Sequence, residues 1–235
     1  MRRLRLQCGL SILLAVSTLG GCAADPPPII IHEEKPLSVW LQFDPSNGTG
    51  HSHPASLTQE QMMAVLRGIG VRSRDTIAGF DAFSAKDSSP AFTSPEASLL
   101  APYLRQALTK ASPKDMATFY AVTRDLTKGE LITSGGMFLR GRYLYVILAN
   151  ARTSPYSNQY ENAHTVDTRD RPLIPIARYR FVATFTPESA WIPNKRVRDQ
   201  DGYDRYLDES KLVVIDLDHL PELPSKPPQP FTPQH

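Results

Sequence analysis

The sequence predicts an α+β domain with a largely antiparallel sheet of about five or six strands and two or three helices. Several short segments alternate apolar and polar residues, which is typical of half-buried strands. Two other segments carry helix-capping signals ahead of apolar residues at helical spacing. Most of the predicted strands are joined by short turns, which favour antiparallel neighbours.

The first half of the domain holds one predicted strand and both clear helices. The segment LSVWLQF at Leu37–Phe43 is rich in residues that favour a pleated surface. Thr58 and Gln61 form a capping-box pattern ahead of a first helix that ends at the glycines 68 and 70. A second helix is predicted with Ser94 as its N-cap, and Pro102 predicts a kink or a restart within it.

The second half is predicted to be mainly strands. Arg140-Gly141 predicts a tight hairpin turn. Gly135-Gly136 lies between predicted strands and indicates a bulge or a close backbone approach. The predicted strands cover residues 116–126, 130–139, 142–149, 176–186 and 211–217, and a short one is expected within 72–77.

Residues 150–175 form a long polar stretch with no strand or helix pattern. Loops of this length are uncommon in compact domains and are often functional or disordered. Tyrosine brings contact area and a hydroxyl at low entropic cost, so the stretch is a candidate partner-binding surface. A plain surface loop is the alternative. The candidate binding residues are Arg152, Tyr156, Asn158 and Tyr160.

The N-terminus has the layout of an export signal. Arg2, Arg3 and Arg5 precede residues 8–21, which carry no charge and are mostly apolar. A membrane-spanning helix needs roughly 20 apolar residues. This stretch is too short for that role and is followed by Asp25 and three prolines.

Leu19-Gly20-Gly21-Cys22 resembles the lipobox of bacterial lipoprotein precursors, with an aliphatic residue, two small residues and a cysteine. The resemblance covers residues 1–24 and identifies a processing class. It implies cleavage after Gly21 and acyl chains on Cys22, which would anchor the protein stably in a membrane. Ala23 resembles the residue of lipoproteins sorted to the outer membrane, so the domain is expected to face the periplasm.

Processing would change the bulk properties of the chain. Removing 21 of the 235 residues leaves 214, and three of the 26 basic residues go with them. Against 24 acidic residues, the formal charge then falls from +2 to −1. A basic surface for nucleic acid is therefore not expected. The two cysteines are Cys8 and Cys22, so the mature domain would hold no free thiol for a disulfide, a metal or catalysis.

Two proline-rich segments flank the predicted domain at 37–218. Residues 22–36 contain Pro26–Pro28 and predict an extended tether, which at about 3.1 Å per residue would reach on the order of 40 Å. The alternative for Ile29, Ile30 and Ile31 is an edge strand of the domain. The tail at 219–235 is rich in proline and has little to bury.

Two clusters could bind a metal. His51 and His53 would point to one face if they lay on a strand, with Asp44 upstream and Glu60 downstream as the nearest carboxylates. Gly50 and Pro54 indicate a loop instead. An acidic run offers oxygen ligands of the kind calcium prefers, but its glycine does not fit an EF-hand, which favours a solvated turn. That run contains Asp199, Asp201 and Asp204 and extends to Asp208 and Glu209.

Familiar nucleophile and phosphate-binding motifs are missing from the sequence. Two hypotheses follow. The first is a non-enzymatic, lipid-anchored module that binds another envelope component and needs no cofactor. The second is an anchored periplasmic hydrolase or metal-binding protein that uses the histidine pair or the acidic run between Asp199 and Glu209.

Overall fold

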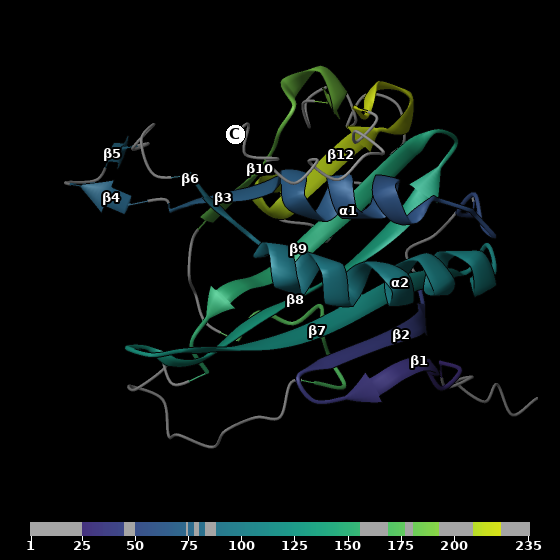
Figure 1. The fold of residues 1–235 in the computed structure, drawn as a ribbon, viewed down its shortest axis with the longest axis horizontal. Coiled ribbons are helices and arrows are strands. Elements are labelled where there is room, and N and C mark those ends of the chain that lie inside the picture. The colour runs from purple at the N-terminus through teal and green to yellow at the C-terminus, as the bar shows by residue number, and fades with distance from the viewer. Residues whose placement is uncertain are drawn as a thin grey trace, which may run out of the picture.

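The computed structural model describes residues 25–44, 50–73, 75–77, 80–82, 88–155, 169–176, 181–192 and 209–221. Within these ranges the chain forms one domain, which two α-helices and a large antiparallel sheet dominate (Figure 1). The predicted α+β class is therefore confirmed, and the two helices match the prediction. The sheet is larger than expected because short edge strands join the predicted ones.

The main sheet has seven strands in the order β1-β2-β7-β8-β9-β12-β11, and all of its neighbours are antiparallel. Its centre is the meander β7–β8–β9, whose strands are the longest in the protein's described part. The strands are β1 (Ile29–Glu34), β2 (Leu37–Phe43), β7 (Asp115–Asp125), β8 (Gly129–Arg140), β9 (Tyr143–Thr153), β11 (Trp191–Ile192) and β12 (Leu212–Asp216).

The remaining elements complete the helical side of the domain. Helix α1 (Gln59–Gly68) runs directly into β3 (Ile69–Ser73), and α2 (Ser94–Lys110) follows a loop. A three-stranded sheet has the order β10-β3-β6, and a short hairpin pairs β4 with β5. These strands are β4 (Asp75–Ile77), β5 (Phe80–Ala82), β6 (Ser88–Pro90) and β10 (Phe181–Phe185), and three short 3-10 helices cover Glu188–Ala190, Glu209–Lys211 and Leu217–His219.

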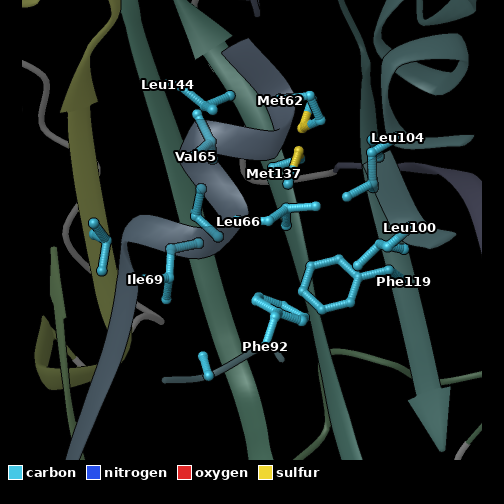
Figure 2. Packing of buried hydrophobic residues seen from close by; sticks show 14 of the residues in the cluster. Met62, Val65, Leu66, Ile69, Phe92, Leu100, Leu104, Phe119, Met137 and Leu144 are labelled. Carbon is cyan, nitrogen blue, oxygen red and sulfur yellow. The ribbon is translucent and has the colours of Figure 1, made fainter. Parts of the chain in front are cut away.

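The core lies between the helices and one face of the seven-stranded sheet. Figure 2 shows apolar side chains of α1 and α2 meeting those of the sheet around Phe119 and Phe92. Alternation along the strands sends every second residue to this face. In β2, for example, Val39 and Leu41 join the helical core, whereas Trp40 belongs to a separate cluster on the opposite face. The sheet therefore has two apolar faces, and the helices cover one of them.

Both helices begin with a capping box, which the sequence predicted only for α1. In α1 the Thr58 side chain accepts from the backbone of Gln61, and the Gln61 side chain accepts from the backbone of Thr58. In α2 the N-cap is Thr93 rather than the predicted Ser94, because Thr93 and Glu96 form the reciprocal pair. Pro102 lies within one continuous helix, so the predicted restart does not occur.

Glu96 ties the start of α2 to the sheet. Its carboxylate accepts hydrogen bonds from the Thr93 backbone at 2.5 Å and from the Thr123 hydroxyl of β7. Arg152 of β9 lies 3.7 Å from the same carboxylate. Burial favours the neutral acid, but the hydrogen bonds from Thr123 and Thr93 and the charge of Arg152 outweigh it and lower the pKa of Glu96.

Glu96→Gln is expected to lower the free energy of unfolding by about 1 kcal/mol at neutral pH. The depressed pKa stabilises the fold above the pKa of an unfolded glutamate, and this contribution is lost as the pH falls through the folded value. The difference from wild type should therefore shrink in acid. Urea unfolding at pH 7 and pH 3.5 would measure it. Glu60→Gln, an exposed first-turn carboxylate of α1, is the control, and an equal loss in that variant would contradict the prediction.

Strand β1 corrects the predicted tether. The structure pairs Ile29–Glu34 with β2, so the edge-strand alternative is right for this part of residues 22–36. A register shift between Ile30 and His32 interrupts the alternation of side chains between the two faces of the sheet. The sequence of this segment therefore lacks the regular pattern by which a strand is predicted. The ordered sheet thus starts eight residues before the predicted domain boundary at residue 37.

Two details of the central meander differ from the prediction. Arg140 pairs with Tyr143, so the two turn residues are Gly141 and Arg142, one position later than predicted. Gly141 has φ +58, a backbone conformation that suits glycine. Strand β9 also continues to Thr153, so the predicted irregular stretch at 150–175 begins with four residues of strand.

Candidate functional site

Residues 169–176, termed the strap here, cross the face of the sheet that the helices leave uncovered. Their carbonyl groups accept hydrogen bonds from three strands in turn. Asp170 accepts from Gln42 of β2, Pro172 from Ser134 of β8, and Ile174 from Asn150 of β9. The side chain of Asn150 also accepts from the backbone of Ile176. The buried side chains of Ser134 and Asn150 fix the strap to the sheet, and Gln42 adds a more exposed hydrogen bond.

A cleft of about 400 Å³ opens between the strap and the first hairpin, β1–β2. The pairing of β1 with β2 places Ile30 opposite Trp40, and both side chains point to the face where the strap lies. Together they form the floor of the cleft. Gln42 follows Trp40 by two residues and shares that face. Within the described ranges the lining is Pro28, Ile30, Glu33, Trp40, Gln42, Arg169 and Asp170.

The lining combines an apolar floor with a charged rim. Pro28, Ile30 and the indole of Trp40 supply apolar area, while Glu33, Arg169 and Asp170 carry charge of both signs. A few polar groups around apolar surface are typical of binding sites in which orientation matters. Among the described residues that line the cleft there is no histidine, cysteine or hydroxyl side chain.

The predicted histidine pair lies elsewhere, in a loop across the end of the sheet. The backbone of His51 donates to Pro113, and that of Ser52 donates to Leu139. Both imidazoles are buried, with 4 % of His51 and 6 % of His53 exposed, and their ring centroids are 5.6 Å apart. The sequence placed the pair on a loop correctly but did not reveal that this loop is packed against the domain.

Asp44 is hydrogen-bonded to the ring of His51. The Nε2 atom of His51 lies 3.0 Å from Oδ2 of Asp44, and the ring stacks on Phe138. An ionised carboxylate only accepts, so Nε2 donates and a neutral ring keeps its lone pair on Nδ1. Within the described ranges, Nδ1 of His51 and both ring nitrogens of His53 have no hydrogen-bond partner.

The buried position of His53 keeps its ring uncharged at neutral pH. Burial, followed by repulsion from His51, lowers the pKa of His53 to about 4, against a smaller attraction from Asp115. Among the described residues, no group of three or more His, Cys, Asp or Glu side chains is arranged to hold a metal ion. Glu60 is exposed on α1. The predicted pair is therefore brought together, but with one bonded carboxylate rather than a full ligand set.

Most of the other predicted site residues lie outside the described ranges. These are Cys22 with the signal sequence, the binding candidates Tyr156, Asn158 and Tyr160, and the acidic residues Asp199, Asp201, Asp204 and Asp208. Arg152 is described. It has φ +48 at the irregular end of the β8–β9 pair, and its side chain forms an ion pair with Glu96. Arg152 thus has a structural role at the start of α2.

The cleft residues were missed in the sequence because three separate segments supply them. The only local signal is the alternation in β2, which places Trp40 and Gln42 on one face. No pattern in the sequence shows that the strap crosses this face. All of the strap except Ile176 falls inside the polar stretch at 150–175, where the prolines and charges resemble those of any surface loop.

The chain matches no protein-family model, no curated protein sequence and no solved structure. Neither of the helices in the described ranges is long and apolar enough to span a bilayer.

Proposed function

We propose that this protein is a lipid-anchored component of the bacterial cell envelope whose domain faces the periplasm and binds another envelope component without catalysing a reaction. The observation that carries the proposal is Leu19-Gly20-Gly21-Cys22, placed directly after a basic start and an uncharged apolar run. Ala23 after the cysteine favours the outer membrane as the site of anchoring.

The cleft supports the binding part of the proposal. It joins an apolar floor at Ile30 and Trp40 to charged groups at Glu33, Arg169 and Asp170. Both of its walls are held by the sheet, one through the β1–β2 register and the other through the hydrogen bond from Gln42 to Asp170. A cleft between two fixed walls needs little ordering when a partner binds, which favours affinity.

The anchor is tested by the mass of the mature N-terminus and by fractionation. We expect an N-terminal peptide that begins at an acylated Cys22, and we expect the protein in the membrane fraction. Cys22→Ser should leave the domain folded and move the protein to the soluble periplasmic fraction, because the acyl chains supply the membrane affinity. An unmodified Cys22 in the wild-type protein would refute the proposed anchoring.

The partner is tested by photocrosslinking in intact cells. A photoreactive residue at Glu33, on the exposed rim of the cleft, should give a discrete adduct of higher mass. The same residue at Leu126, which is fully exposed in the β7–β8 turn, is the matched control. Adducts that form equally at both positions, or at neither, would count against a partner at the cleft.

A further inference from the structure

Strand β1 shortens the connection between the proposed anchor and the domain. The predicted tether, 14 residues from Ala23 to Pro36, would have allowed the domain to sit on the order of 40 Å from the membrane. Because the sheet begins at Ile29, only seven residue steps separate it from Cys22. At about 3.1 Å per residue these steps span roughly 22 Å, and full extension adds only a few ångströms.

The end of the sheet nearest the proposed anchor exposes apolar side chains. Ile29 is 56 % exposed and Ile30 is 60 % exposed, and they are the first two residues of β1. Pro26, Pro27 and Pro28 directly before them are exposed as well. Successive residues of a strand point to opposite sides, so the two isoleucines present apolar surface on both sides of the sheet edge.

We propose that Ile29, Ile30 and the prolines before them form a membrane-facing edge that rests in the headgroup region of the bilayer in which Cys22 is anchored. The inference rests on the proposed lipidation of Cys22. The anchor makes contact between this edge and the bilayer an intramolecular event, so a small apolar surface is sufficient. The isoleucines alone would not hold an unanchored domain on a membrane.

The charges around this edge identify the kind of membrane contact. Asp25 lies four residues before Ile29, Glu33 and Glu34 lie at the other end of β1, and Lys35 follows in the turn; all four are exposed. An excess of carboxylates gains nothing from anionic lipids. Contact through apolar side chains should therefore occur on zwitterionic membranes and should weaken when anionic lipid is added.

The orientation also places the cleft close to the membrane. Ile30 belongs both to the membrane-facing edge and to the cleft floor, and Pro28 lines the cleft. The opposite end of the sheet points away. Ile29 pairs with Leu41, and Leu41 pairs with Ala117, so Ile29 and Ala117 lie at the same level of the sheet. Leu126 follows Ala117 by nine residues, which at roughly 3.3 Å per residue places it about 30 Å from that level. Figure 1 shows the start of β1 and the β7–β8 turn at opposite ends of the sheet.

The test uses a nitroxide label on the lipidated full-length protein in phosphatidylcholine vesicles. An introduced cysteine is the only free thiol once Cys8 is removed and Cys22 is acylated. In Ile30→Cys the label should be more accessible to oxygen than to a water-soluble nickel complex, as expected for a probe in the headgroup region. In the matched control Leu126→Cys the label should be freely accessible to the nickel complex.

A nitroxide label at a second position allows the isoleucines themselves to be replaced. A label at Glu33→Cys should show at least a twofold loss of nickel accessibility when vesicles are present. Replacing Ile29 and Ile30 by serine in the same protein should abolish that loss, and circular dichroism would confirm that the fold is kept. Adding anionic lipid should reduce the protection at position 33.

Three results would overturn the inference. Equal nickel accessibility at positions 30 and 126 would show that the edge does not touch the bilayer. Strong spin–spin coupling between labels at position 30, without lipid contact, would show that β1 pairs with a second copy of the chain instead. Protection that persists after both isoleucines are replaced would assign it to another surface. A mass spectrum without acyl chains on Cys22 would instead refute the proposed anchoring, so the two failures are distinguishable.

Discussion

Gly135→Ala is expected to lower the free energy of unfolding by about 3 kcal/mol, the upper range for overpacking a core. A Cβ atom on Gly135 would overlap the backbone carbonyl oxygen of Ile147 on the neighbouring strand and would touch the ring of Phe119. Both neighbours lie in the centre of the sheet, so the strands would have to separate to accept one methyl group. Urea denaturation at pH 7 would measure the loss.

Gly136→Ala is the matched control, because it adds the same methyl group one residue later. The Cβ atom there would approach Sδ of Met116 at 2.5 Å, and that flexible side chain can move aside. We expect a loss of about 1 kcal/mol or less. Equal losses at the two glycines would show that close backbone approach is not what requires Gly135.

Acid is expected to destabilise the protein through His53. The pKa of His53 is about 4 in the folded protein and about 6.5 when the chain is unfolded. The folded state therefore favours the neutral ring, and this contribution is complete above pH 6.5 and is lost as the pH falls from 6.5 towards 4. We expect a loss of about 2 kcal/mol, because nearby charges and solvent offset part of the cost of burying the charge. Unfolding in urea across this pH window would measure it.

His53→Leu should flatten the pH profile, because it removes the group that takes up the proton. It should change the stability at pH 7 little, since it also removes two buried nitrogens that have no hydrogen-bond partner among the described residues. His32→Gln is the control. It loses the stacking of His32 on Tyr103 at every pH and should keep the wild-type slope. A wild-type slope in His53→Leu would assign the acid sensitivity to other groups.

Local chemistry made several elements predictable. The capping box at Thr58 and the residues of Leu37–Phe43 act over a few positions, so the start of α1 and the bounds of β2 were correct. Gly135-Gly136 was also interpreted correctly, as the register shift and the close Ile147 carbonyl show. The residues of the capping box and of the strand are neighbours in the sequence. The glycine pair is itself a signal, because glycine within a strand often marks a bulge or a close backbone approach.

The errors arose where distant segments decide the outcome. Ile29–Glu34 is a strand because β2 offers it a partner, while the prolines before it and the acidic residues at its end suggest a spacer. The burial of His51 depends on Phe138 and on backbone bonds to Pro113, which lie far away in the sequence. The cleft depends on the strap, whose path is set by Ser134 and Asn150.

The order of strands in the main sheet also constrains how the protein can form. The meander β7–β8–β9 is continuous in the sequence from Asp115 to Thr153, whereas β2 must wait for a partner more than 70 residues later. Contacts that close long stretches of chain form slowly. In a chain exported from its N-terminus, the β1–β2 hairpin would thus reach the periplasm first and stay without its sheet until β7 had crossed. This interval would leave the core side chains of β2, Val39 and Leu41, open to a chaperone or to the membrane.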